Sequence, residues 1–382
     1  MARVLILGGG FGGLAAAHEL RDLLGDGDEI VLVSRSEQFF MGFAKLWDLA
    51  GMRPIDQGTV QLSRLSEHGV RYLQAEVTAI DAERRAVTTS AGDLEGDALL
   101  VALGDVPAPG HLDLLQAEGA HNLYDADQLP AMRRALESID GGRVLVSILG
   151  GPFKCPPAPY EAALLVDERL RQRGVRDQVE VAVSTPQPMS LPVAGPDASR
   201  YVADHLRERD IELLSPRTVA AVPADRHVVV FGDGSEVEFR VLLGVPASAP
   251  LPVLRANPVA AESGWIEPDR HTLRTAFERV YAVGDCTNIP TAKGALPKAG
   301  VFAAAEGQVA ARNIAADLGY GDRATFDGHG YCFLELPDRR VAFVEGDFYA
   351  QPEPDVHLTD ADEEQFRRKQ DFERQRLDTW LG

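Results

Sequence analysis

Two stretches of the chain share one pattern of hydrophobic and polar positions. The first has the apolar run VLIL at 4–7, a helical pattern over 14–24 and a second apolar run, EIVLVS, at 29–34. The second has RVLVSIL at 143–149, followed by the amphipathic segment APYEAALLVDERLRQRG at 158–174. Continuous apolar runs of this length are typical of strands buried on both faces of a parallel sheet. The pattern therefore predicts two α/β units, each built on a parallel sheet.

A glycine-rich turn joins the first strand to its helix. Gly8, Gly10 and Gly13 form a G-x-G-x-x-G motif directly after the strand. Glycine lets the backbone turn sharply and approach a pyrophosphate, and the helix N-terminus offers unpaired N–H groups and a positive dipole end. With strand, helix and second strand in register, we predict a dinucleotide site here. The second strand ends in Ser34-Arg35 instead of the usual acidic residue, so we expect Ser34 to hydrogen-bond the ribose and Arg35 to reach the adenine or a phosphate.

The corresponding turn of the second unit has a different composition. It reads GGPFKCPPAPYE at 150–161. Proline has no N–H group to donate to a phosphate, and Phe153 and Lys154 occupy places that require small residues. The fold is expected to remain while the pyrophosphate site is lost, so we expect NAD(P)H not to be the electron donor.

Two later strands each end in Gly-Asp, within DALLVALGD at 97–105 and FERVYAVGDCTNIP at 277–290. The stretch at 327–349 predicts a hairpin, and the tail at 359–382 predicts a helix with an incomplete apolar face. We therefore predict an α/β fold with two Rossmann-like dinucleotide-binding domains, the second degenerate, and a small C-terminal α+β domain. The predicted boundaries are 1–105 with 271–325, then 106–270, then 326–382.

Composition and charge narrow the function. The formal net charge of −20 argues against a nucleic-acid partner, because phosphate binding requires clustered basic residues. The chain starts with MARVLILGGG, without the pattern of a signal peptide, and no run approaches the ~20 apolar residues of a membrane helix. We expect a cytoplasmic protein, at most peripheral to a membrane. Lysine is rare, with only five residues: Lys45, Lys154, Lys293, Lys298 and Lys369.

The order of these motifs resembles the pyridine nucleotide–disulfide oxidoreductase superfamily, the flavoproteins with two dinucleotide-binding domains. The segments ALGD and VYAVGD, which contain Gly104 and Gly284, match the two places where the family's chain passes the cofactor. The resemblance implies FAD as the cofactor and a role for Asp285 in holding the flavin ribityl chain. It also places Lys298, within PKAG before a helix, at the pyrimidine end of the flavin, where negative charge develops on reduction.

The Pro-rich turn resembles the sulfide-oxidising branch of that superfamily, which contains sulfide:quinone oxidoreductase and the flavoprotein subunit of flavocytochrome c sulfide dehydrogenase. Family members carry one redox cysteine in this turn and its partner in the C-terminal domain; Cys155 and Cys332 match these positions. The resemblance implies that sulfide opens a disulfide between them by thiol–disulfide exchange. Glu161, six residues after Cys155, is either a proton handler or a carboxylate favoured in the first turn of a helix.

Some features of the branch are absent. Several sulfide:quinone oxidoreductases have a third cysteine near position 124, where this chain reads HNLYDAD. The flavocytochrome subunit links its flavin to a cysteine in the segment matching SEQFFMGF at 36–43, and this chain has none there. We therefore expect noncovalent FAD. The remaining cysteine, Cys286, is expected to be a buried spacer beside the flavin loop.

The expected partners follow from the resemblance. Sulfide or another small thiol is the substrate, and a quinone or a cytochrome is the acceptor; loose contact of the tail with a membrane surface and a homodimer both stay open. Two other functions also stay open. One is a type II NADH:quinone oxidoreductase, which should have an intact second glycine-rich turn. The other is a non-enzymatic redox sensor in which the cysteine pair changes a binding surface.

Overall fold

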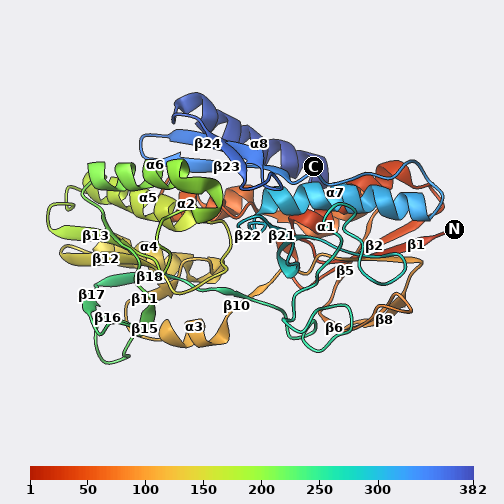
Figure 1. The fold of residues 1–382 in the computed structure, drawn as a ribbon, viewed down its shortest axis with the longest axis horizontal. Helices are drawn as coiled ribbons and strands as arrows, with labels where there is room; N and C mark the ends of the chain where they lie inside the picture. The colour runs from red at the N-terminus through yellow and green to blue at the C-terminus, as the bar shows by residue number, and fades with distance from the viewer.

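The computed structural model describes all residues, Met1–Gly382, and arranges them in three units. Two α/β units lie side by side, and the C-terminal hairpin and helix lie across both of them (Figure 1). This arrangement confirms the predicted α/β fold with two parallel sheets and a small C-terminal part.

The first unit is built on a five-stranded sheet in the order β20-β9-β1-β2-β5, with every pairing parallel. Alternate side chains of β1 enter two different cores: Val4 and Ile6 pack towards helices α1 and α7, whereas Leu5 and Leu7 pack on the opposite face. This is the period of two that a strand imposes. The main elements are β1 Arg3–Leu7, α1 Phe11–Leu23, β2 Glu29–Ser34, β5 Arg71–Gln74, β9 Ala98–Val101, β20 Val280–Ala282 and α7 Gly300–Asp317.

Smaller elements complete this unit. An antiparallel sheet of β6, β7 and β8 covers part of the second face, and short pairs and turns connect the main strands. Their bounds are β3 Gln38–Phe39, β4 Val60–Gln61, β6 Val77–Asp81, β7 Ala86–Thr89, β8 Gly92–Glu95, β21 Pro290–Thr291 and β22 Gly294–Ala295, with 3-10 turns at Ile55–Gly58, Leu62–His68 and Gly284–Cys286. Helix α2, Ala44–Leu49, follows β3 in the chain but packs Leu46 and Leu49 into the core of the second unit.

The second unit repeats the plan with a parallel sheet in the order β11-β18-β12-β13-β14. Its strands are continuous apolar runs because helices cover one face and a small antiparallel sheet, β15-β16-β17, helps to cover the other. The elements are α3 Pro109–Leu114, β11 Ala120–Asn122, α4 Leu129–Ser138, β12 Gly142–Ile148, α5 Ala158–Gln172, β13 Val179–Ser184, α6 Gly195–Glu208, β14 Glu212–Leu214, β15 Val219–Ala221, β16 Val228–Phe231, β17 Glu236–Glu238 and β18 Val241–Val245.

The chain passes between the two units twice, and the two crossings pair with each other as β10 (Val106–Pro107) and β19 (Ser248–Ala249). After this pair the chain belongs to the first unit again. Leu254, Val259 and Ile266 are buried in the core behind the first sheet. Residues 250–270, which we had assigned to the second unit, therefore cover the first sheet instead.

The C-terminal unit joins both others. The strands β23 (His329–Leu336), β24 (Arg340–Asp347) and β25 (Asp355–Leu358) form an antiparallel sheet, and α8 spans Glu363–Leu381. Leu334 and Leu336 enter the core of the second unit. Trp380 of α8 meets the rings of Phe11 and Phe39 in the first unit, each at 5.9 Å between centroids.

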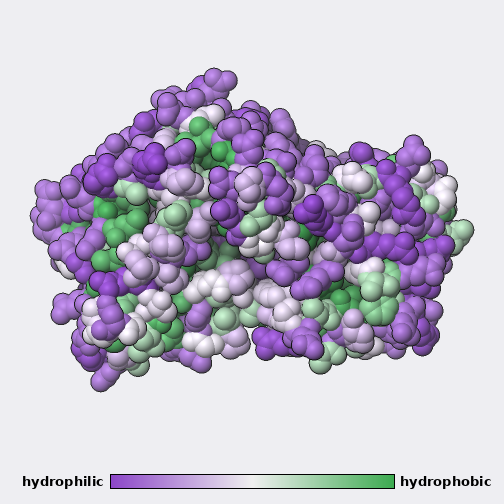
Figure 2. All heavy atoms as spheres, in the orientation of Figure 1, coloured by the Kyte–Doolittle hydropathy of each residue, from purple (hydrophilic) through white to green (hydrophobic).

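The apolar residues of α8 are used for packing inside the chain. Phe366, Trp380 and Leu381 are buried, and the face of the molecule in Figure 2 is mostly polar with small, separate apolar areas. The only large apolar side chains that are exposed are Met1 and Met189. No helix combines the length and apolar character needed to cross a membrane.

The small residues of α7 serve the packing of two helices. Ala304, Ala310 and Ala311 are buried in the core shared with α1, whereas Ala303 reaches the cavity described below. The closest approach is at Gly307, where a Cβ would stand 2.3 Å from the carbonyl oxygen of Gly12.

We predict that Gly307→Ala lowers the free energy of unfolding by about 1–3 kcal/mol, because the added methyl overlaps backbone atoms that have no room to move. Urea denaturation measures the change. The control is Gly110→Ala in α3, where a Cβ meets nothing within 4 Å. That variant should be neutral or slightly stabilising, since alanine loses less entropy in a helix. Equal stabilities for the two variants would contradict the close helix contact.

Candidate functional site

A cavity of about 390 Å³ lies where the three units meet. It is lined by the glycine turn and the start of α7 from the first unit, by the Pro-rich turn and α5 from the second, and by β23 and α8 from the C-terminal unit. The predicted site residues that line it are Gly10, Gly104, Cys155, Glu161, Gly284, Asp285, Lys298 and Cys332.

The glycine turn is shaped to hold a pyrophosphate. A Cβ at Gly8 would stand 2.1 Å from the oxygen of Ala102, and one at Gly13 would stand 1.9 Å from the oxygen of Gly8. Gly8 also has a φ of +115°. A Cβ at Gly10 would meet nothing within 4 Å, and Gly10 lines the cavity. The first and third glycines therefore let the turn close, and the second leaves space for a ligand at the start of α1, as a dinucleotide requires.

The end of β2 lies outside this cavity. Ser34 is buried, whereas the side chain of Arg35 is exposed. One guanidinium nitrogen of Arg35, Nη1, lies 4.0 Å from Glu76 Oε1. Neither residue lines the cavity. Their predicted contacts with the ribose, the adenine or a phosphate stay predictions.

Lys298 and Lys154 bind acidic and carbonyl groups near Asp285, on the side of the cavity away from the glycine turn. Lys298 Nζ donates to the carbonyl oxygens of Asp285 at 2.6 Å and Thr287 at 3.1 Å. Lys154 Nζ lies 2.6 Å from Asp105 Oδ1, which ties the Pro-rich turn to the end of β9. Burial raises the pKa of Asp285, and Asp105 raises it further, while both lysines oppose the shift.

Contacts with other parts of the chain hold the Pro-rich turn in place. Cys155 has a φ of +48°, and its N–H donates to Lys298 O at 2.8 Å. The hydroxyl of Tyr124 donates to Lys154 O at 2.6 Å. The turn is thus fixed by contacts with other parts of the chain, and its shape presents a cysteine to the cavity.

Cys155 and Cys332 come from different units and line the same cavity as free, half-buried thiols. The pKa of Cys155 is well above its usual range, first because of its hydrogen-bonding interaction with the Cys332 side chain and then because of burial. Cys286 is fully buried in the core behind the first sheet, as expected for a spacer, and burial raises its pKa to about 12.

Glu161 belongs to a buried cluster that the sequence did not reveal. Its Oε1 accepts from the backbone N–H of Glu335 at 2.7 Å and lies 3.4 Å from Lys369 Nζ. Lys369 Nζ also lies 2.6 Å from Glu335 Oε2, and Trp47 Nε1 donates to both Glu335 oxygens. Burial raises the pKa of Glu161, against the opposing effect of Lys369.

The sequence contains a signal that could have identified Lys369 as a functional candidate, because lysine is rare in this chain. Four of the five lysines line the cavity, whereas Lys293 is exposed near Glu353. Lys154 lies next to Cys155 in sequence, but its ammonium pairs with Asp105. The ammonium that lowers the pKa of Cys155 is that of Lys369. Burial, followed by Lys154, lowers the pKa of Lys45 to about 8.

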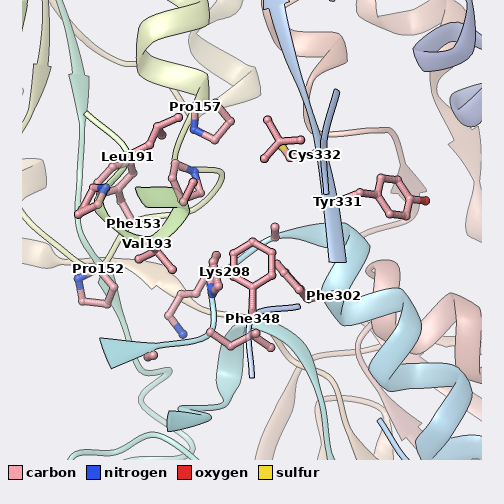
Figure 3. A pocket seen from close by; sticks show the side chains of 18 of the residues that line it. Pro152, Phe153, Pro157, Leu191, Val193, Lys298, Phe302, Tyr331, Cys332 and Phe348 are labelled. Carbon is pink, nitrogen blue, oxygen red and sulfur yellow. The ribbon is translucent and has the colours of Figure 1, made fainter. Parts of the chain in front are cut away.

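A second cavity, of about 240 Å³, is also lined by Cys332. Its walls are mainly apolar side chains from the Pro-rich turn, the segment before α6, the start of α7 and the hairpin, and it shares Lys298, Ala299 and Cys332 with the first cavity. Figure 3 shows Cys332 and Tyr331 projecting from opposite sides of β23. Cys332 therefore stands between two cavities.

Comparison with known proteins agrees with this architecture. Residues 2–299 match the family model described as pyridine nucleotide-disulphide oxidoreductase. The chain is 26% identical over 381 residues to the mitochondrial sulfide:quinone oxidoreductase of Mus musculus, which covers 91% of this chain and 79% of the relative. It is 23% identical over 384 residues to a type II NADH:quinone oxidoreductase of Staphylococcus aureus, which covers 90% and 92%.

Among solved structures, the sulfide:quinone oxidoreductase of Aquifex aeolicus has a TM-score of 0.87 and 23% sequence identity, and the likeness covers 100% of this chain and 92% of that one. It shows that the fold is shared. The resemblance drawn from the motif order and the Pro-rich turn is confirmed by these comparisons.

One carboxyl beneath the site should make stability depend on pH. Glu306 Oε2 accepts from the N–H of Gly284 at 2.6 Å, and burial raises the pKa of this carboxyl to about 7. Between its ordinary pKa near 4.5 and 7, the folded chain keeps a proton that the unfolded chain has lost. Stability is therefore lost as the pH rises through this window.

We predict that Glu306→Gln, which keeps an acceptor for Gly284, raises the free energy of unfolding at pH 8 by up to about 3 kcal/mol and changes it little at pH 4.5. Urea denaturation at both pH values measures this difference. Glu353→Gln, at an exposed carboxylate, is the control and should show no such pH dependence. A constant effect of Glu306→Gln across the range would mean that this carboxyl does not titrate there.

Proposed function

The chain belongs to the pyridine nucleotide-disulphide oxidoreductase family, and from this premise we propose that it is a flavin-dependent enzyme that oxidises sulfide and reduces a quinone. The observation that carries the proposal is the meeting of Cys155 and Cys332, from two different units, in the cavity that also contains the glycine turn and Asp285. Relatives named sulfide:quinone oxidoreductase support it.

Noncovalent FAD is the cofactor in this proposal. The turn at Gly8, Gly10 and Gly13 would hold the pyrophosphate, Asp285 the ribityl chain, and Lys298 with the start of α7 the pyrimidine end. Bound FAD supplies the ability to take two electrons from a sulfur and pass them on. The segment 36–43 contains no cysteine to which the flavin could be linked.

The cysteine pair receives the sulfide. A hydrosulfide ion attacks the Cys155–Cys332 disulfide, one new S–S bond forms and the old one breaks, so one cysteine becomes a persulfide and the other a thiolate. This thiolate lies in the cavity in which Gly10, Asp285 and Lys298 would hold the flavin, and the flavin would supply the acceptor for its electron pair. Over the cycle the sulfide sulfur loses two electrons, and a quinone takes up two electrons and two protons.

Glu161 is the proposed proton handler of this exchange. It is buried, lines the same cavity as both cysteines, and has a raised pKa because of burial. A carboxyl whose pKa is raised by burial holds its proton more readily than an ordinary carboxyl and can pass it to a neighbouring group. Glu161 also lies in the first turn of α5, so the alternative role of a carboxylate favoured by the helix dipole stays open beside proton handling.

A quinone is the preferred acceptor, and a cytochrome is the alternative. The apolar second cavity beside Cys332 supports a small apolar molecule near the redox centre (Figure 3). The charge of −20 supports the cytochrome, because an acidic surface attracts a basic haem protein. A location in the cytoplasm or at a membrane surface is consistent with either acceptor.

We predict that Cys155→Ser and Cys332→Ser each reduce sulfide-dependent quinone reduction to background while FAD stays bound, because each sulfur is needed for the exchange. Cys286→Ser is the control and should retain most of the activity. Turnover is followed by quinone absorbance, and FAD is measured in the supernatant after acid precipitation. Full turnover in Cys155→Ser would contradict the proposal, and flavin bleaching by NADH but not by sulfide would favour the NADH:quinone oxidoreductase alternative.

We also predict that the rate of flavin reoxidation by a small quinone changes little with ionic strength. Reoxidation by a basic cytochrome would instead slow steeply, because salt screens the attraction between charged surfaces. Stopped-flow reoxidation of the sulfide-reduced protein across a salt series separates the two. Reoxidation by cytochrome alone, suppressed by salt, would contradict the quinone assignment.

A further inference from the structure

The cluster of Glu161, Glu335 and Lys369 joins three elements, α5, β23 and α8, at one point. All three side chains are at most 2% exposed. They carry two carboxyl groups and one ammonium, so the cluster is electrically neutral only when one carboxyl holds a proton. A neutral cluster is strongly favoured because burying a net charge is costly.

The hydrogen bonds decide which carboxyl holds the proton. Glu335 Oε1 accepts from Trp47, and Glu335 Oε2 accepts from Trp47 and from Lys369, so both of its oxygens face N–H donors. Glu161 Oε1 likewise accepts from Glu335 N and from Lys369. Glu161 Oε2 accepts no hydrogen bond from the protein and is the one oxygen with room for a proton.

The carboxyl group of Glu161 shares a cavity with the redox pair. Glu161 lines the cavity that Cys155 and Cys332 also line, and the Cys155 thiol is electrostatically coupled to both Glu161 and Lys369. Lys369 and Glu335 lie beside the Glu161 carboxyl group. The other titratable and charged groups that share its cavity are Cys155, Cys332, Tyr124, Lys45, Lys154, Asp285 and Lys298.

We propose that Lys369 and Glu335 are positioning residues that fix Glu161 as a neutral acid with its proton on Oε2, directed at the Cys155–Cys332 pair. The inference rests on the proposed function. When hydrosulfide opens the disulfide, the proton moves from Oε2 to the sulfur that leaves, and Lys369 compensates the new carboxylate. When a second sulfide or thiol has taken up the outer persulfide sulfur and the two cysteines re-form their disulfide, the electron pair would pass to the bound flavin and the proton would return to Oε2, so the cycle consumes no proton at this site.

A paired variant tests this arrangement. Lys369→Met alone would leave the buried Glu335 unpaired and the chain prone to misfold. The double variant E335Q/K369M removes one charge of each sign. The matched control is R53M/E373Q, which removes the other buried ion pair of α8, between Arg53 and Glu373, without touching Glu161.

The first measurement needs no turnover. In a Cys332→Ser background, the rate at which iodoacetamide alkylates Cys155 is followed against pH. Without the Lys369 ammonium, E335Q/K369M should shift the midpoint of this titration upwards by about one pH unit, whereas R53M/E373Q should not shift it. An unshifted midpoint in E335Q/K369M would overturn the proposal, even if sulfide oxidation itself is confirmed.

The second measurement uses the flavin-loaded enzyme with both cysteines. We expect E335Q/K369M to lower kcat for sulfide by about tenfold or more and to move its pH profile, with less change in KM. Lys369→Arg, which keeps the charge, should restore most of kcat. A kcat and pH profile equal to those of R53M/E373Q would show that the cluster is only structural. Loss of activity in Cys155→Ser remains the separate test of the proposed function.

Discussion

The buried ammonium of Lys369 is the contact on which the arrangement of the three units depends. Its Nζ lies 2.6 Å from Oε2 of Glu335 in the hairpin and 3.4 Å from Oε1 of Glu161 on α5 of the second unit. A charge removed from water is tolerated only where partners replace its hydration, so this cluster is favourable only when α8, β23 and α5 are docked together. The pair of Arg53 and Glu373 attaches the same helix to the first unit. The C-terminal segment is therefore part of the site.

Much of the fold could be predicted because buried parallel strands leave continuous apolar runs and because the glycine turn has few alternatives. The extent of the second unit could not. Residues 250–270 contain isolated apolar positions, among them Leu254, Val259 and Ile266, that follow no helix or strand period. Only the sheet face that they cover shows where they belong, and that face is assembled from distant strands.

The sequence predicted the cysteines and Glu161 of the site but not the partners of its lysines. Cys155, Cys332 and Glu161 line one cavity because the resemblance located them on elements whose positions the fold determines. The partners of the lysines depend on how separate units dock, which no local pattern records. Lys154 lies next to Cys155 in sequence yet pairs with Asp105, whereas Lys369, distant in sequence, acts on the cysteine.

The crossing between the two α/β units is narrow, since β10 and β19 pair through only two residues each. Such a ribbon resists bending weakly, so by itself it would act as a hinge. The hairpin spans both units on another side of the molecule and closes the structure into a ring of three contacts (Figure 1). Because Cys155 lies in the second unit and Cys332 in the segment that closes the structure, the distance between the two sulfurs is set by how the three units dock.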